Sequence, residues 1–375
     1  MSLSPPPPAG CPGAKLKAMS AVFLCFALLS NGCGTYPRDG VDPAQAQRLE
    51  AGISHRASEL SREQEDRILA LDPDHVTAAE VHSVLKGAPA PQLINIHGGF
   101  ASVIKYMVSF GDFLIGMGYP ESSIRNAADG TYTFSCYEDS EMIAGMIAWY
   151  YEKEGMRPMI VGHSQGGIQA VKILQKLARP PSEPLAVWNP LTWQREPRDQ
   201  ITDPLTGKPR PVVGLVLPYA TAVGAGGLGR VVPNQWDMTL DLRTIPDSVE
   251  EFTGFYKRAD LLGGDLLGYG SVNLYTASGS AVVRNIRLPW TYNHRAIPDT
   301  KQLLQSQAIL DWIDRYRPAD QAPPEPKFDA DSRNILWAAD VWFSIKKHWV
   351  IELQRLIRAQ RAAASAAGAE PARAN

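Results

Sequence analysis

The segment Met159–Ile168 places a serine between glycines in a pattern that can create a nucleophile. It reads Met-Ile-Val-Gly-His-Ser-Gln-Gly-Gly-Ile, an apolar strand that enters Gly-x-Ser-x-Gly and leaves into a helix. Such a sharp strand-to-helix turn holds the serine exposed and strained, and small flanking glycines prevent clashes with neighbouring backbone. Ser164 is therefore the candidate nucleophile, and Gly162, His163 and Gly166 form its elbow.

This segment resembles the nucleophile elbow of the α/β-hydrolase superfamily, specifically the lipase and esterase type with Gly-His-Ser-x-Gly-Gly. The resemblance covers about 91–318, and its motifs are specific to the superfamily rather than to a substrate. It implies an α/β fold, with a mostly parallel central sheet flanked by helices and with inserted cap loops. It also implies a catalytic order of serine, acid and histidine, with the histidine on the loop after the final strand.

A serine hydroxyl needs a base to take its proton, and that base must be held in the right tautomer by an acid. The chain has seven histidines, of which three precede the expected sheet. His163 adjoins the nucleophile with its ring expected to point away from the hydroxyl, His97 lies beside a glycine-rich loop, and His348 belongs to a C-terminal helix. His294 remains, after the last expected strand, and is the candidate base.

The order implied by the resemblance places the acid between the serine and the histidine, at the end of the preceding strand. Asp260 follows the expected strand 251–256 and is the first candidate. Asp265 is the reserve.

An oxyanion needs donors that are already oriented, normally backbone N–H groups. Gln165, directly after the nucleophile, is expected to supply one of them. Residues 93–100, Leu-Ile-Asn-Ile-His-Gly-Gly-Phe, resemble the His-Gly oxyanion motif of the family. Gly99 is the expected second donor, with Phe100 as the next choice.

These residues predict a serine hydrolase that cleaves carboxylic esters through an acyl-enzyme, with a small-molecule or lipid ester as substrate. No metal or organic cofactor is needed. The same triad would serve a thioesterase, an amidase or a polyester depolymerase. The rival from another class is a catalytically silent scaffold of this fold that acts as a binding protein at the cell envelope.

Composition agrees with a folded enzyme. The 375 residues are 45% hydrophobic and 20% charged, which argues against a disordered, fibrous or polytopic membrane protein. Lys and Arg total 37 against 39 Asp and Glu, so the basic excess typical of a nucleic-acid binder is absent. Three of the four cysteines lie within the first 33 residues, and we expect the fourth, Cys136, to be an ordinary buried residue.

The N-terminus resembles an export signal, assigned to 1–32. Lys15 and Lys17 precede the apolar run Ala18–Leu29, which is too short to span a bilayer but has the length of a secretory core. The following Ser-Asn-Gly-Cys resembles a lipoprotein processing site that would lipidate Cys33 and anchor the chain to a membrane. Cleavage by ordinary signal peptidase and a buried N-terminal helix are the alternatives. Export predicts a bacterial cell-envelope, periplasmic or secreted protein.

The remaining chain divides into three parts: a linker with helices (33–90), a catalytic domain (91–318), and a linker, helix and disordered tail (319–375). In the first part, the apolar spacing predicts a helix over 43–70, and Asp72-Pro73-Asp74 opens a shorter one ending near Gly87. In the last part, an amphipathic helix is expected over 329–362.

The catalytic domain alternates short apolar runs with helical stretches, which predicts βαβ units. The expected strands are 92–96, 159–161, 212–217, 251–256 and 282–288. The expected helices are 103–117, 135–154, with Ser135 and Glu138 as a capping box, 166–178 and 300–316. Two irregular insertions, 179–210 and 219–246, are expected to cover the site.

Overall fold

The computed structural model describes most of the chain between the two termini. It describes residues 40–55, 60–225, 241–263, 265, 273–318, 326–328 and 330–369. The expected signal peptide and the lipidation site Cys33 lie outside these residues. Among the residues described, none of the helices combines the length and apolar composition that a membrane span requires.

Six parallel strands form the central sheet, and helices flank it on both faces, which makes this an α/β fold. In chain order the strands are β1 (Leu93–His97), β2 (Phe134–Ser135), β3 (Met159–His163), β8 (Leu217–Val223), β10 (Val249–Tyr256) and β12 (Val282–Arg287). Their spatial order is β12-β10-β8-β3-β1-β2. The chain thus leaves β1 toward one edge and β3 toward the other, so the order reverses between these two neighbours. In open α/β sheets, ligands bind at the carboxyl ends of the strands beside such a reversal.

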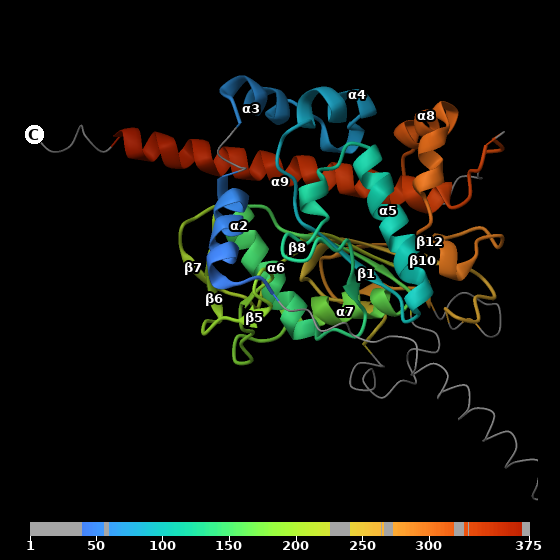
Figure 1. Cartoon of the computed structure of the whole chain (residues 1–375), viewed down its shortest axis with the longest axis horizontal. Coiled ribbons are helices and arrows are strands. Elements are labelled where there is room, and N and C mark those ends of the chain that lie inside the picture. The colour runs from blue at the N-terminus through green and yellow to red at the C-terminus, as the bar shows by residue number, and fades with distance from the viewer. Residues whose placement is uncertain are drawn as a thin grey trace, which may run out of the picture.

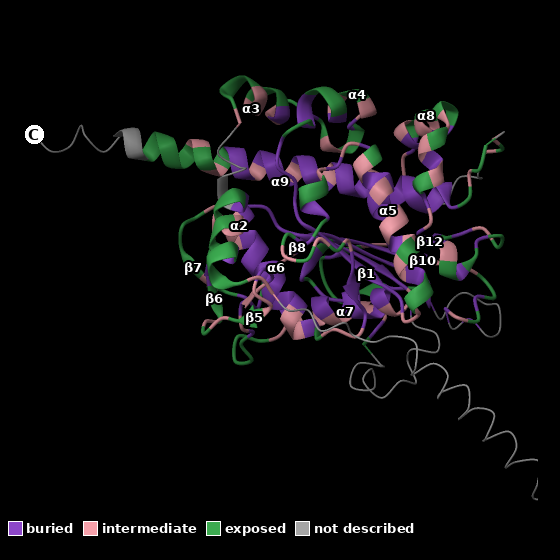
Figure 2. Cartoon of the chain, in the orientation of Figure 1, coloured by how far each residue is buried: buried purple, intermediate pink, exposed green. Residues whose placement is uncertain are grey.

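Helices cover the sheet in two separate layers. The longer ones are α2 (Pro43–His55), α3 (Arg62–Leu69), α5 (Ile104–Gly116), α6 (Ser140–Glu154), α7 (Gln165–Leu177), α8 (Gln307–Arg315) and α9 (Ile335–Ala369). Neighbouring strand residues point to opposite faces: Met159 and Val161 join the core beneath α5, α8 and α9, and Ile160 joins the core beneath α6 and α7. Figure 2 shows the sheet and the inner faces of these helices as buried. Every residue of β1, β3 and β8 is buried, because helices cover both faces of these strands.

Short elements connect these layers. They are η2 (Pro73–His75), α4 (Ala78–Glu80), η3 (Val81–Leu85), η4 (Ala101–Val103), η5 (Glu121–Ser123), η9 (His294–Ala296) and η10 (Lys301–Gln305). In the described part of the chain, three further pairs of short strands lie outside the central sheet: β4 (Trp188–Asn189) with β5 (Gln194–Arg195), β6 (Gln200–Thr202) with β7 (Pro209–Pro211), and β9 (Thr244–Ile245) with β11 (Thr276–Ala277).

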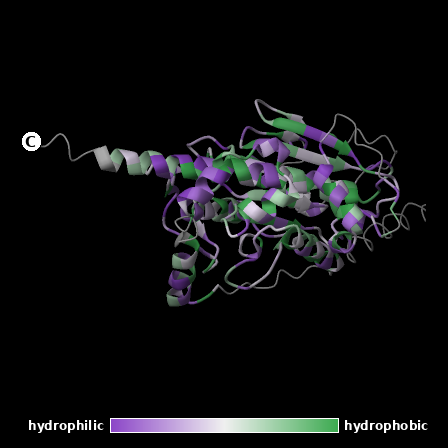
Figure 3. Cartoon of the chain, turned by 90° about the horizontal axis from the view of Figure 1, so that it is seen from above, coloured by the Kyte–Doolittle hydropathy of each residue, from purple (hydrophilic) through white to green (hydrophobic). Residues whose placement is uncertain are grey.

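Helix α9 is a central element of the core, not a peripheral one. It runs between the sheet on one side and α3 and α4 on the other (Figure 1). The indoles of Trp337, Trp342 and Trp349 are all at most 1% exposed. Its C-terminal turns extend beyond the body of the protein, as the view from above shows (Figure 3). The helix therefore reaches Ala369, beyond the expected end at 362 and into the stretch expected to be disordered.

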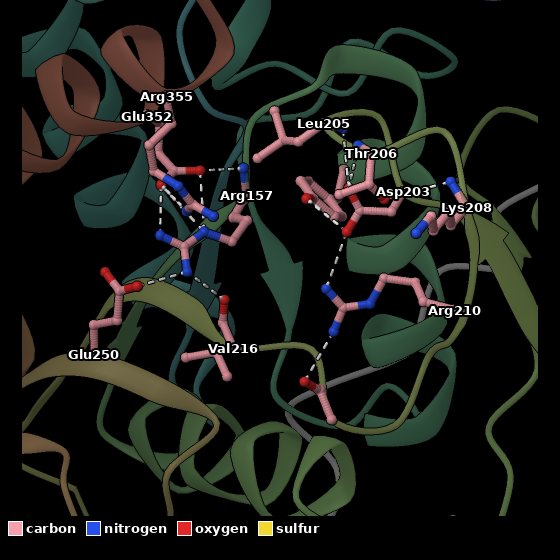
Figure 4. A network of polar contacts seen from close by, with 12 residues as sticks. Arg157, Asp203, Leu205, Thr206, Lys208, Arg210, Val216, Glu250, Glu352 and Arg355 are labelled. Carbon is pink, nitrogen blue, oxygen red and sulfur yellow. Dashed lines mark hydrogen bonds and ion pairs between the residues drawn. The ribbon is translucent and has the colours of Figure 1, made fainter. Parts of the chain in front are cut away.

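Charged side chains fasten α9 to the sheet. Arg157, just before β3, donates to both carboxylate oxygens of Glu352 on α9 and to Glu250, the second residue of β10 (Figure 4). Burial alone would raise the pKa of Glu352, but the hydrogen bonds and charge of Arg157 hold it below its usual value. Arg284 on β12 makes the corresponding contact with Asp340, at 2.9 Å. The polar side of α9 is thus paired inside the protein, whereas an amphipathic surface helix would expose it.

Several expected boundaries are wrong. The expected helix 43–70 is two helices, α2 and α3, and the expected helix ending near Gly87 is the short series η2, α4 and η3. The expected helix 300–316 is likewise divided into η10 and α8.

The expected start of α6 and the expected strand 212–217 are also wrong. Ser135 pairs with His97 in the sheet, so no capping box forms there, and the side chain of Asp139 caps α6 instead. Leu217 begins β8 rather than ending a strand, because Gly214, at φ +79°, forms a turn before it. Strand β8 was missed because Ala220 and Ala222 are small.

The insertion 179–210 is more regular than expected, since it contains the β4–β5 and β6–β7 hairpins. Arg198 within it donates to Glu152 near the end of α6, at 2.6 Å. This end of α6 leads to the start of β3. The contact between Arg198 and Glu152 therefore lies near the amino end of β3, whereas Ser164 follows its carboxyl end. The other insertion, 219–246, begins within β8, and its residues 226–240 lie outside the described part.

Candidate active site

Ser164 lies at the turn between β3 and α7, in a conformation that an L-residue rarely adopts. Its φ of 54° and ψ of −121° fall outside the regions open to side chains without strain. The surroundings hold it there: its N–H donates to the carbonyl of Val223 at 2.8 Å, and its own carbonyl accepts from the N–H of Gly167 at 3.0 Å. This backbone conformation places the hydroxyl at the carboxyl end of the sheet.

The two elbow glycines are required by close packing. A Cβ at Gly162 would overlap the carbonyl of Gly166, and a Cβ at Gly166 would overlap the carbonyl of Ile96 on β1. Any larger residue would push α7 away from the sheet. Both glycines thus lie where a side chain would clash with neighbouring backbone.

His294 lies next to Ser164 in the fold, although it is 130 residues further along the chain. It opens the short helix η9 after β12, and its Nε2 lies 3.0 Å from the Ser164 Oγ. Its Nδ1 lies 2.7 Å from the Oδ2 of Asp260. The imidazole is therefore held between a carboxylate and a hydroxyl.

Asp260 follows β10 and is 3% exposed. Its Oδ1 accepts from the N–H of Gly263 at 3.0 Å, while Oδ2 faces the imidazole. Burial alone would raise the pKa of Asp260, but its hydrogen bonds with His294 and Gly263 keep it below the usual value, and the carboxylate stays ionised. Asp265 accepts from the N–H of Ala259 and donates its own N–H to the Asp260 carbonyl, so it braces the turn. The carboxylate at the imidazole is that of Asp260.

The glycine loop after β1 lies against the nucleophile. A Cβ at Gly98 would be 2.9 Å from the Cβ of Ser164, and one at Gly99 would overlap the side chain of Gln165. Gln165 is the first residue of α7, where backbone N–H groups have no intrahelical acceptor and the helix dipole is positive. Phe100 ends the loop, with the Arg295 guanidinium 4.9 Å from its ring centre. The loop that holds Gly99 thus lies beside Ser164 and Gln165, and Phe100 follows it in the chain.

A glycine lies directly beneath the imidazole. Gly224 follows β8 with φ +60°, and a Cβ there would be 2.8 Å from the Cε1 of His294 and 3.5 Å from the Oδ2 of Asp260. Only glycine leaves room for the ring in this position. Sequence reasoning did not identify Gly224, and its place at the end of a strand beside the nucleophile strand was the available signal.

The backbone on either side of His294 is held by side chains. Lys257 donates to the carbonyl of Tyr292 at 2.7 Å, and Asn334, just before α9, donates to the carbonyl of Ala296 at 2.7 Å. The ring of His163 contacts the carbonyl of His294 itself, through Nε2. Sequence reasoning assigned no such role to Lys257 or Asn334, because each is far along the chain from the residue whose carbonyl it contacts.

The other candidates are accounted for by ordinary contacts. His348 on α9 is 3% exposed and lies 3.2 Å from Glu251. His97 is also buried, with its Nδ1 2.8 Å from the carbonyl of Gly98. Cys136 is 2% exposed, in agreement with the expectation of a buried residue.

Within the part of the chain that is described, no three His, Cys, Asp or Glu side chains are grouped so that they could hold a metal ion. Comparisons of the sequence with protein-family models and with curated proteins find no match.

Proposed function

We propose that this chain is a serine hydrolase of the α/β-hydrolase superfamily, of the lipase and esterase type, which cleaves carboxylic esters. The observation that carries the proposal is the continuous contact from Asp260 through His294 to Ser164, at 2.7 and 3.0 Å. A nucleophile, a base and an orienting acid within hydrogen-bond reach are the arrangement that acyl transfer requires.

Each group has one role in the proposed mechanism. Ionised Asp260 accepts the Nδ1–H of His294, which leaves the Nε2 lone pair directed at the Ser164 hydroxyl. Nε2 takes the hydroxyl proton as Oγ attacks the ester carbonyl, and it returns that proton to the leaving alcohol. A water molecule, activated by the same nitrogen, then attacks the acyl-enzyme and releases the acid.

Negative charge on the tetrahedral oxygen is stabilised by the backbone N–H of Gln165 and by that of Gly99 or Phe100. The first belongs to the N-terminus of α7, and the second to the loop that touches Ser164. These donors are fixed by the fold and need not reorient as charge develops. No step in this scheme needs a metal or an organic cofactor.

We propose a small-molecule or lipid ester as the substrate and the insertion that follows β8 as the cover of the site. That insertion leaves the sheet at the carboxyl ends of the strands, where Val223 pairs with His163 and Gly224 lies next to the imidazole.

We also propose that the chain is exported to the cell envelope, on the evidence of the N-terminal sequence. Palmitate incorporation in the wild type that disappears in Cys33→Ser would support lipid anchoring, and incorporation that persists would contradict it.

Labelling with a fluorophosphonate tests the enzymatic proposal. The probe reacts with activated serines, so we expect one adduct on Ser164 in the wild type and none in Ser164→Ala. His294→Ala should label far more slowly, because the base is gone. Folded wild-type protein that takes up no label would favour the silent scaffold. A panel of acyl esters of increasing chain length then defines the substrate.

A further inference from the structure

Within the described part of the chain, the ring of His163 makes one hydrogen bond, and its acceptor belongs to the backbone of the proposed catalytic base. Its Nε2 lies 2.7 Å from the carbonyl oxygen of His294. A carbonyl can only accept, so Nε2 carries the hydrogen. The side chain is fully buried, and burial lowers the pKa of His163 to about 3, which keeps the ring neutral.

The other ring nitrogen of His163, Nδ1, has no hydrogen-bond partner among the residues that the structure describes. A Cβ on neighbouring Gly98 would lie 3.3 Å from it. Burying a polar nitrogen without a partner costs free energy, and an apolar side chain would avoid this cost. A residue that only filled space would not need an imidazole here. The donor on Nε2 is the property that distinguishes it.

The bond joins the strand that carries the nucleophile to the loop that carries the base, and the positions of these two parts relative to each other must stay fixed. His163 is the last residue of β3 and directly precedes Ser164, so its donor is fixed to the strand that carries the nucleophile. The loop of His294 is already anchored on either side, at Tyr292 by Lys257 and at Ala296 by Asn334. Loss of the His163 bond would therefore leave the loop in place and free only the backbone that carries the imidazole.

We propose that His163 is a positioning residue, whose Nε2–H holds the backbone of His294 where its imidazole meets the hydroxyl of Ser164. The inference rests on the proposed function. A misplacement of about 1 Å can cost on the order of 10²-fold in rate, because acyl transfer needs the base and the hydroxyl in near-attack geometry.

Two substitutions and one control test it. His163→Leu fills the space without a donor, and His163→Gln keeps an N–H at a similar distance from the backbone. Ser248→Ala is the control, since it removes another buried donor, from Oγ to the carbonyl of Leu174 at 2.7 Å, before the start of β10 and away from the site. For each variant, kcat per labelled serine, KM and the free energy of unfolding in urea are measured.

We expect kcat per labelled serine to fall roughly 10- to 100-fold in His163→Leu, with little change in KM. His163→Gln should recover most of this loss, and Ser248→Ala should lower the free energy of unfolding without changing kcat per labelled serine. An unchanged kcat in His163→Leu, or equal losses in the leucine and glutamine variants at equal stability, would overturn the inference. A wild type without label would instead refute the proposed function.

If His163→Leu does not fold, the contact can be tested in the wild type. Nitrogen-15 NMR of the imidazole groups should show His163 as the neutral Nε2–H tautomer between pH 5 and 8. A ring that is protonated in this range, or that carries its hydrogen on Nδ1, would overturn the inference even if the enzyme is active.

Discussion

Replacing Asp260 by asparagine changes the tautomer of the base while preserving the shape of the site. The carboxylate accepts two hydrogen bonds, one from the His294 Nδ1 side at 2.7 Å and one from the N–H of Gly263 at 3.0 Å. An amide has only one oxygen. If that oxygen faces Gly263, the amide N–H₂ faces Nδ1, which must then accept, and the imidazole hydrogen moves to Nε2.

An imidazole with hydrogen on Nε2 presents a donor to Ser164 and has no lone pair there to take the hydroxyl proton. The opposite amide orientation would leave the buried N–H of Gly263 facing a second donor, at a cost of about 1–3 kcal/mol. Asp260→Asn should therefore lower kcat on the order of 10⁴-fold, equivalent to about 5 kcal/mol of transition-state stabilisation.

The assay is kcat per correctly folded enzyme on a soluble ester, with circular dichroism as the check on folding. Asp265→Asn is the matched control. Its side chain accepts from the N–H of Ala259 at 2.9 Å, and an asparagine oxygen can replace that acceptor. We expect this control to stay close to wild-type kcat. Wild-type turnover in Asp260→Asn, or an equal loss in Asp265→Asn, would refute the assignment of the acid.

Three other perturbations have defined outcomes. Gly224→Ala should lower kcat on the order of 10²-fold in the same ester assay, because its Cβ would lie 2.8 Å from the ring of His294; normal turnover would show that the ring can shift without penalty. Arg157→Met should lower the free energy of unfolding by about 3–5 kcal/mol in urea, because it removes the buried partner of the Glu352 carboxylate and leaves only Arg355, whose side chain is 35% exposed, and adding Glu352→Leu should restore much of the loss. If the double variant is no more stable than the single one, an uncompensated charge is not the cause. His348 and other partners outweigh burial and lower the pKa of Glu251 from 4.5 to about 2, so this carboxylate stabilises the fold above pH 4.5 and loses its contribution, on the order of 3 kcal/mol, as pH falls toward 2. Melting temperature against pH should be flatter in Glu251→Gln over that range, and an identical profile would contradict the assigned pKa.

Sequence reasoning could identify the candidate triad because each of its residues lies in a short sequence pattern that can be recognised locally. The Gly-x-Ser-x-Gly pattern around Ser164 is continuous in the sequence, although the contact that requires Gly166 is made by Ile96 on β1, and Asp260 and His294 each follow a strand. The choice between Asp260 and Asp265 needed coordinates, since both lie after β10 and only the fold of the turn directs one carboxylate to the imidazole.

Tertiary contacts explain what sequence reasoning missed. The polar residues of α9, such as Asp340 and Glu352, have the spacing of a solvent face, yet their partners Arg284 and Arg157 lie on or beside sheet strands far away in the chain. Strand β8 is rich in alanine because α7 packs closely on it, and a Cβ added at Gly167 would lie 2.9 Å from that of Ala222. Neither the arginine partners of α9 nor the packing of α7 on β8 can be recognised from a local sequence pattern.

The most direct test of the account is to trap the covalent intermediate. Wild-type enzyme mixed with an activated ester and quenched in acid within the first turnover should carry one acyl group, which peptide mass spectrometry should locate on Ser164. Ser164→Ala should carry none and should hydrolyse the ester no faster than buffer does. Rapid hydrolysis with no acyl group on Ser164, or undiminished turnover by Ser164→Ala, would contradict the account.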